Sequence, residues 1–169
     1  MTDDVGDWIQ YAFYSRASTD DVKECLQGGG DPNARGALDT TLLHLAASWS
    51  NPDLVEKLIA LGGDPDARDV NGQTPLHLAA GVMSSTYESI PDVAVKLIEA
   101  GTDVNARDVN GQTPLHWAAR RRNSRVATRL LSAGANPDTK DKHGRTPRQY
   151  SGELRWLSIE LRSTLRHFL

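Results

Sequence analysis

Several features that define other protein classes are scarce or missing in this chain of 169 residues. It has a single cysteine, which excludes a small secreted scaffold built on internal disulfides. No apolar run approaches the roughly 20 residues that a membrane helix needs. The first residues are acidic, whereas a signal peptide begins with positive charge followed by an apolar stretch. We therefore expect a soluble, cytoplasmic protein that does not enter a membrane.

An excess of positive charge is missing too. The chain holds 19 Lys plus Arg against 22 Asp plus Glu, and this net charge of -3 argues against a general nucleic-acid binder. The small total hides a polarised distribution. Residues 1–84 carry 5 basic and 13 acidic side chains (-8), and residues 85–169 carry 14 and 9 (+5), which sum to -3. In an elongated fold these two halves would stay apart in space.

An internal repeat is the main feature that is present. Residues 69–80 read DVNGQTPLHLAA, and residues 108–119 read DVNGQTPLHWAA. Weaker copies are TLLHLAA at 41–47 and DKHGRTP at 141–147. The central threonines stand at positions 41, 74, 113 and 146, so the steps are 33, 39 and 33 residues.

Each unit predicts a helix, a turn, a second helix and a hairpin-like connection. Thr-Pro starts the first helix, because threonine caps a free N–H group and proline fits the first helical position. A second apolar segment repeats in phase, as VEKLIALGGD at 55–64 and AVKLIEAGTD at 94–103. Its glycine marks the helix end, and Asn-Gly then predicts a tight turn. One unit cannot bury its apolar face alone, so the units must stack.

The pattern Asp-x-x-Gly-x-Thr-Pro-Leu-His-x-Ala-Ala with a period of 33 resembles the ankyrin repeat over nearly the whole chain. This resemblance implies an all-α solenoid of stacked helix-turn-helix units joined by β-hairpin-like loops. It also implies a non-enzymatic protein-binding module whose partner surface is the concave face, made of the hairpin tips and the first helix of each unit.

We expect a single domain over residues 1–169 with five units. These are an N-cap repeat (about 3–35), a repeat at 36–68, one at 69–107, one at 108–140 and a C-cap repeat at 141–169. The repeat at 69–107 has six extra residues within Gly81–Pro91, which are either an additional binding loop or an elaboration without a role. In the repeat at 36–68, Leu38 and Asp39 replace Asn-Gly, so a distorted or specialised tip is expected there.

The repeated histidines His44, His77 and His116 suggest a metal site at first sight. Each stands in a different layer, however, and helical layers pack roughly 8–10 Å apart, whereas zinc needs nitrogen ligands at about 2.0–2.1 Å. The preferred interpretation is local bracing of the helix start and hairpin, with no metal and no cofactor. No serine has a catalytic motif around it, so no enzyme activity is predicted.

Four arginines within six residues form the strongest charge cluster: Arg120, Arg121, Arg122 and Arg125. The cluster is either a solvated loop or a surface for an acidic partner, since arginine favours bidentate contacts with carboxylate or phosphate. Nucleic acid fits it less well, because the basic stripe is short and the first half of the chain is acidic.

Aromatic residues and hairpin tips complete the predicted binding surface. Trp49 shares the frame position of Arg121 and is the better anchor, because tryptophan and arginine dominate interface energetics. Trp117 is either a second anchor or a core residue between repeats. The first and fourth tips differ from the two identical middle ones and add Leu38, Lys142, His143 and Arg145.

The function predicted from these features is binding of a partner protein that has an acidic surface patch. An inhibitor or immunity-type role is the favoured form. The alternatives are a scaffold or adaptor, a structural subunit of a larger complex, and, further behind, an enzyme subunit or a nucleic-acid binder. No small-molecule substrate is indicated.

Overall fold

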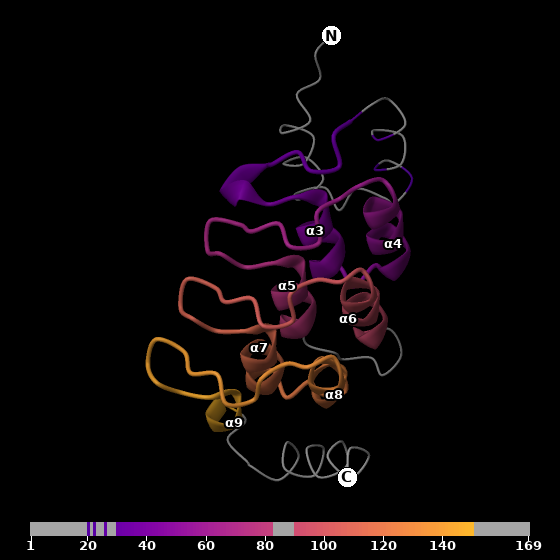
Figure 1. Cartoon of the computed structure of the whole chain (residues 1–169). Coiled ribbons are helices and arrows are strands. Elements are labelled where there is room, and N and C mark those ends of the chain that lie inside the picture. Colours follow the sequence, from indigo (N-terminus) through magenta and orange to yellow (C-terminus); the bar gives the residue numbers. More distant parts are fainter. Residues whose placement is uncertain (1–19, 21, 23–25, 27–29, 83–89, 151–169) are drawn as a thin grey trace.

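The computed structural model describes residues 20, 22, 26, 30–82 and 90–150. Helices in this part of the chain form two rows (Figure 1). The inner row consists of α3 (Leu42–Ser48), α5 (Pro75–Gly81), α7 (Pro114–Arg120) and α9 (Pro147–Tyr150). The outer row consists of α4 (Pro52–Ala60), α6 (Ile90–Glu99) and α8 (Ser124–Ser132). A short 3-10 helix, η1 (Ala37–Asp39), forms the tip of the first hairpin.

The helices stack in the order of the sequence repeats. Within the inner row α3 packs on α5, α5 on α7 and α7 on α9, and within the outer row α4 packs on α6 and α6 on α8. Each inner helix that is followed by an outer one packs on it, as in the pairs α3–α4, α5–α6 and α7–α8. This arrangement confirms the predicted solenoid, in which each unit touches mainly its neighbours.

Parts of the predicted end units lie outside the described residues. This applies to most of the N-cap repeat at 3–35, to positions 151–169 of the C-cap repeat and to positions 83–89 of the segment Gly81–Pro91 that holds the six extra residues. Cys25 also lies outside them. The described units between them keep the predicted spacing, with helices beginning after Thr41, Thr74 and Thr113.

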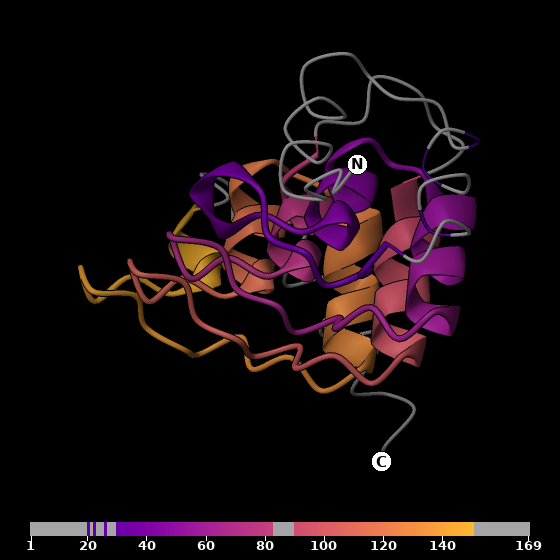
Figure 2. The same ribbon diagram turned by 90° about the horizontal axis from the view of Figure 1, so that it is seen from above.

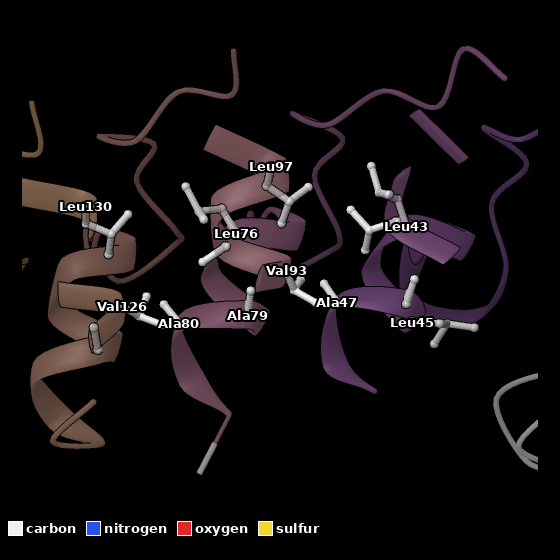
Figure 3. Close-up of a cluster of buried hydrophobic side chains, with 14 of the residues drawn as sticks. Leu43, Leu45, Ala47, Leu76, Ala79, Ala80, Val93, Leu97, Val126 and Leu130 are labelled. Atoms are coloured by element: carbon white, nitrogen blue, oxygen red, sulfur yellow. The ribbon is translucent and has the colours of Figure 1, made fainter. Parts of the chain in front are cut away.

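A buried apolar cluster lies between the two helix rows (Figure 3). Leucines supply its largest side chains, among them Leu43 and Leu76 from the inner row and Leu97 and Leu130 from the outer row. The Ala-Ala pairs of the repeat are also fully or almost fully buried. Their small side chains let neighbouring inner helices approach closely, which explains why the motif places alanine there.

Two outer helices, α4 and α8, begin at capping asparagines, and all three outer helices end at the glycines that the sequence predicts. The Asn51 side chain accepts a hydrogen bond from the Leu54 backbone at 3.0 Å, which caps α4. After these helices, Gly62, Gly101 and Gly134 have φ values of 88°, 83° and 90°. Only glycine adopts this left-handed conformation at little cost, so these residues end the helices and turn the chain toward the next hairpin.

Four hairpins extend to one side of the helix rows, beyond the inner row (Figure 2). The surface formed by the hairpins and the inner helices is called the inner face below. The inner face corresponds to the concave face that the ankyrin resemblance predicts as the partner surface.

Candidate functional site

The hairpin tips are held in shape by aspartate side chains. In the second tip, Asp69 Oδ1 accepts hydrogen bonds from the backbone N–H groups of Asn71 at 2.9 Å and Gln73 at 2.8 Å. Asp108 and Asp141 make the same pair of bonds in the third and fourth tips, at 2.8–2.9 Å. Each of these tips is therefore a closed turn that presents its side chains in a fixed position.

The first tip has a different backbone. Gly36 stands where the other hairpins have the aspartate, and the two central residues, Leu38 and Asp39, have φ values of 61° and 56°. Both residues lie in the left-handed region, which costs a non-glycine residue about 1–2 kcal/mol. The Leu38 side chain is also 65 % exposed. The distortion expected from the sequence is present, and it displays an apolar side chain at the tip.

Arginines join neighbouring hairpins into one body. Arg35 donates to the Arg68 carbonyl at 2.8 Å, Arg68 donates to the Arg107 carbonyl, and Arg107 donates to the Lys140 carbonyl at 2.7 Å. These bonds to charged donors stabilise each hairpin against the next. The inner face is therefore preorganised along the described stack.

The repeated histidines connect each inner helix to the following hairpin. His77 Nδ1 accepts the Thr74 backbone N–H at 3.1 Å and lies 3.0 Å from the Thr74 hydroxyl, while Nε2 donates to the Gln112 carbonyl at 3.1 Å. His44 and His116 repeat this geometry within 0.1 Å. Burial lowers the pKa of all three rings and outweighs the hydrogen bonds that raise it.

The histidine geometry supports the local bracing that the sequence predicts. In each case both ring nitrogens are engaged within one unit and its neighbouring hairpin. Within the ranges that the structure describes, no group of three or more His, Cys, Asp or Glu side chains is arranged to hold a metal ion.

Trp117 and Tyr150 occupy equivalent places in successive units. The Trp117 indole donates to Asp108 Oδ2 at 3.2 Å, and the Tyr150 hydroxyl donates to Asp141 Oδ2. Trp117 lies edge-on to the His77 ring at 6.2 Å, and Tyr150 lies edge-on to the next histidine in the same way at 5.7 Å. The contact with His77 places Trp117 between two units, as the second of its two interpretations expects, and its role as a binding anchor stays a prediction.

The fourth hairpin is held by Tyr150. Its hydroxyl accepts a hydrogen bond from the Gln112 side chain at 2.7 Å while it donates to Asp141. Arg145 pairs with Asp141 at 3.3 Å and lies 4.4 Å from the centre of the Tyr150 ring. Burial alone would raise the pKa of Asp141, but the hydrogen bonds from Tyr150, Arg145 and His143 hold it well below its usual range. The Arg145 side chain therefore stabilises the fourth hairpin through its contacts with Asp141 and Tyr150.

The arginine cluster lies at the opposite end of α7 from the hairpins. Arg120 is the last residue of α7, Arg121 follows as its C-cap, and Arg122 has a left-handed φ of 56°. Arg125 lies in the first turn of α8, and all four residues are exposed. The third hairpin directly precedes α7, whose seven residues place the cluster about 10 Å from the base of that hairpin.

Apart from Trp117, which lies between two units, the predicted binding residues fall into two groups at the two edges of the inner face. The tip group contains Leu38, Lys142, His143 and Arg145. The helix-end group contains Trp49 and the four arginines of the cluster. Trp49 is the C-cap of α3, as Arg121 is of α7, but it is half-buried and packs against the core, so only part of its ring is accessible.

Sequence reasoning missed the network around Tyr150 and Asp141. The signal was present, because Tyr150 stands 33 residues after Trp117 and each aromatic ring stands nine residues after the aspartate that it contacts. Gln149 likewise replaces the histidine, and its side chain accepts the Thr146 N–H at 2.8 Å. Glutamine at this position is the usual partner in a capping box.

The stacked helix pairs, the connected hairpins and the histidine braces define a helical-repeat protein with a rigid, one-sided surface. The family pattern for ankyrin repeats (3 copies) matches residues 9–90 and residues 82–155. The chain belongs to the ankyrin-repeat family, whose repeats are general protein–protein interaction modules and are typically non-enzymatic. A search of curated proteins found no match. None of the described helices has the length and apolar character required to cross a membrane.

Proposed function

We propose that this protein binds a partner protein through its inner face and that the arginine cluster contacts an acidic patch on the partner. The observation that carries the proposal is the state of Arg120 and Arg122. Both side chains are exposed, and neither has a hydrogen-bond or ion-pair partner among the described residues. Charged groups that the fold does not use are available to a partner.

The backbone at Arg122 supports the same proposal. This residue has a left-handed φ of 56°, which costs a non-glycine residue about 1–2 kcal/mol and which glycine would adopt without strain. Arginine at the C-terminus of α7 is compensated in part by the helix dipole. Ser50 has the same left-handed φ at the equivalent position after α3, so the turn sets this backbone, and an arginine in place of glycine there adds an exposed charge for a partner.

Preorganisation supports an inhibitory or immunity-type role. The arginine bonds between hairpins and the histidine braces fix the inner face before binding, so little conformational entropy is lost on association. A rigid surface of this kind can inhibit a partner by covering the partner's functional site. Loss of the partner's activity in the purified complex supports this role, and retained activity assigns the protein to scaffolds or adaptors instead.

The acidic-partner proposal is tested by charge reversal with a matched control. The variant R120E/R122E reverses two charges of the cluster, and K57E/R129E reverses two exposed charges on the outer helices α4 and α8. Partners captured by the wild-type protein from its native cells should be lost with the first variant and kept with the second. Equal capture by both variants would contradict the proposal.

A further inference from the structure

The four hairpin tips form one continuous row along the stack (Figure 1). A backbone hydrogen bond joins each neighbouring pair of tips. Val70 N–H donates to the Leu38 carbonyl at 3.1 Å, Val109 N–H to the Asn71 carbonyl at 2.8 Å, and Lys142 N–H to the Asn110 carbonyl at 2.9 Å. The residues at the ends of these bonds are therefore in lateral contact, and they are called the tip row below.

Exposed apolar side chains gather in this row. Leu38, Val70 and Val109 are 65 %, 50 % and 46 % exposed. Of the large apolar side chains that are exposed in the described part of the chain, only Leu61 lies elsewhere. Single exposed apolar residues are normal on a protein surface, but their alignment in one row indicates a contact surface.

The two ends of the row carry opposite charge. At the first tip, Asp39 is exposed beside Leu38, and at the fourth tip Lys142 takes the frame position of the valines, next to the exposed His143. Lys142 has no side-chain partner among the described residues. A partner that lies along the row therefore meets apolar contacts first and a positive charge at the fourth tip, which complements a carboxylate.

The spacing of the tips selects the conformation of the partner. Each hairpin contributes two chain segments, and hydrogen-bonded segments lie about 4.8 Å apart, so the tips repeat about every 10 Å. A polyproline II helix has three residues per turn and rises about 3.1 Å per residue. Every third side chain of such a segment therefore returns to the same side after about 9 Å and meets the next tip.

The polar groups between the apolar contacts favour an extended partner over an α-helix. Asn71 and Asn110 are exposed beside Val70 and Val109, and no hydrogen bond from either side-chain amide is formed among the described residues. The backbone of a polyproline II segment has unpaired N–H and C=O groups that can bond these amides. An α-helix has already satisfied its own backbone groups and cannot use them.

We propose that the tip row binds an extended, polyproline II-like segment of a partner protein, with an apolar side chain at every third position and a carboxylate one step further, opposite Lys142. This inference rests on the proposed function, because it names the kind of segment that the binding module takes.

The probe is a labelled synthetic peptide with leucine at every third position in a proline-rich background, ending in aspartate. A second peptide carries the same pattern in reverse. One control spaces the leucines at four residues in the proline-rich background, and the other spaces them at seven residues in an alanine-rich background that permits an α-helix. Binding to the full chain is measured by fluorescence anisotropy. One of the two three-residue peptides should bind better than both controls.

Substitutions in the row provide the second readout. V70S/V109S should weaken binding of that peptide about tenfold or more, because two apolar contacts are lost. L61S changes the exposed apolar residue outside the row and should leave the affinity unchanged. K142E should weaken binding of the aspartate peptide more than binding of its asparagine counterpart.

Three outcomes would overturn the inference: no binding of either three-residue peptide, equal or tighter binding of a control peptide, or equal affinity for wild type and V70S/V109S. None of these outcomes affects the proposed function, which is tested separately with R120E/R122E and the intact partner. Failure of the peptide inference can therefore be distinguished from failure of the proposed function. Tighter binding of the seven-residue peptide would assign the row to a helical partner.

Discussion

Acidification should destabilise this protein through its three buried histidines. His44, His77 and His116 are fully buried, and burial lowers the pKa of each ring in the folded state. A ring with a lowered pKa stays neutral in the fold, whereas in the unfolded chain it takes up a proton below about pH 6.5. The unfolded state then binds more protons, so stability is complete above pH 6.5 and falls as the pH drops below it.

The size of the effect follows from the linkage relation. Between about pH 7.5 and pH 5.5, a histidine that stays neutral in the fold removes about 1.4 kcal/mol from the free energy of unfolding. Three such residues set a limit of about 4 kcal/mol, a large part of the 5–15 kcal/mol typical of a domain. Protonation would also break the bond that each Nδ1 accepts from a threonine N–H.

The assay is urea unfolding followed by circular dichroism at several pH values. The control is H143Q, because this variant removes an exposed histidine of the fourth tip and leaves the three buried rings in place. In H77Q the slope of stability against pH should decrease, since glutamine can still cap the helix but does not titrate. A wild-type stability that stays constant from about pH 7.5 to pH 5.5 would refute the reasoning.

Three substitutions test other features of the fold by the same urea measurement. L38N/D39G should stabilise the protein by about 1–2 kcal/mol, because both residues have positive φ and Asn-Gly suits such a turn; an unchanged midpoint would contradict this. G81A should cost about 1–3 kcal/mol, because an added Cβ would stand 2.5 Å from the Trp117 ring, and full tolerance would show that the ring shifts freely. Y150F keeps the ring but loses two hydrogen bonds and should cost about 1–3 kcal/mol, which a wild-type midpoint would disprove.

Local signals in the sequence were sufficient to predict the helices. Thr74-Pro75 begins α5, and Gly62 ends α4 in the left-handed conformation that its position requires. These choices depend on backbone geometry within one unit, and the period of 33 then predicts the stack. Packing between units follows from the repeated Ala-Ala pairs and leucines, so the fold class could be derived from the residues alone.

The geometry of the binding surface was harder to predict. Substitution of Asn-Gly by Leu38-Asp39 indicated a distorted tip, but the exposure of Leu38 depends on a backbone that only the structure shows. The spacing of nine residues between Tyr150 and Asp141 repeats that of Trp117 and Asp108, but the bond from Gln112, 38 positions away, is in no local pattern. The position of the arginine cluster, at the opposite end of α7 from the third hairpin, likewise depends on the direction of α7.

Charge has two separate uses in this solenoid. Aspartates are largely part of the frame: besides the three tip aspartates, Asp31, Asp64 and Asp103 each accept the backbone N–H two residues further on, at 2.8–2.9 Å. The basic side chains of Arg120, Arg122 and Lys142 make no such bonds within the described residues. Because position in the sequence maps onto position along the stack, the net charge of -3 conceals a basic C-terminal half to which these three side chains belong. These charges should raise the rate of encounter with the proposed acidic partner, and this effect should weaken as salt screens it.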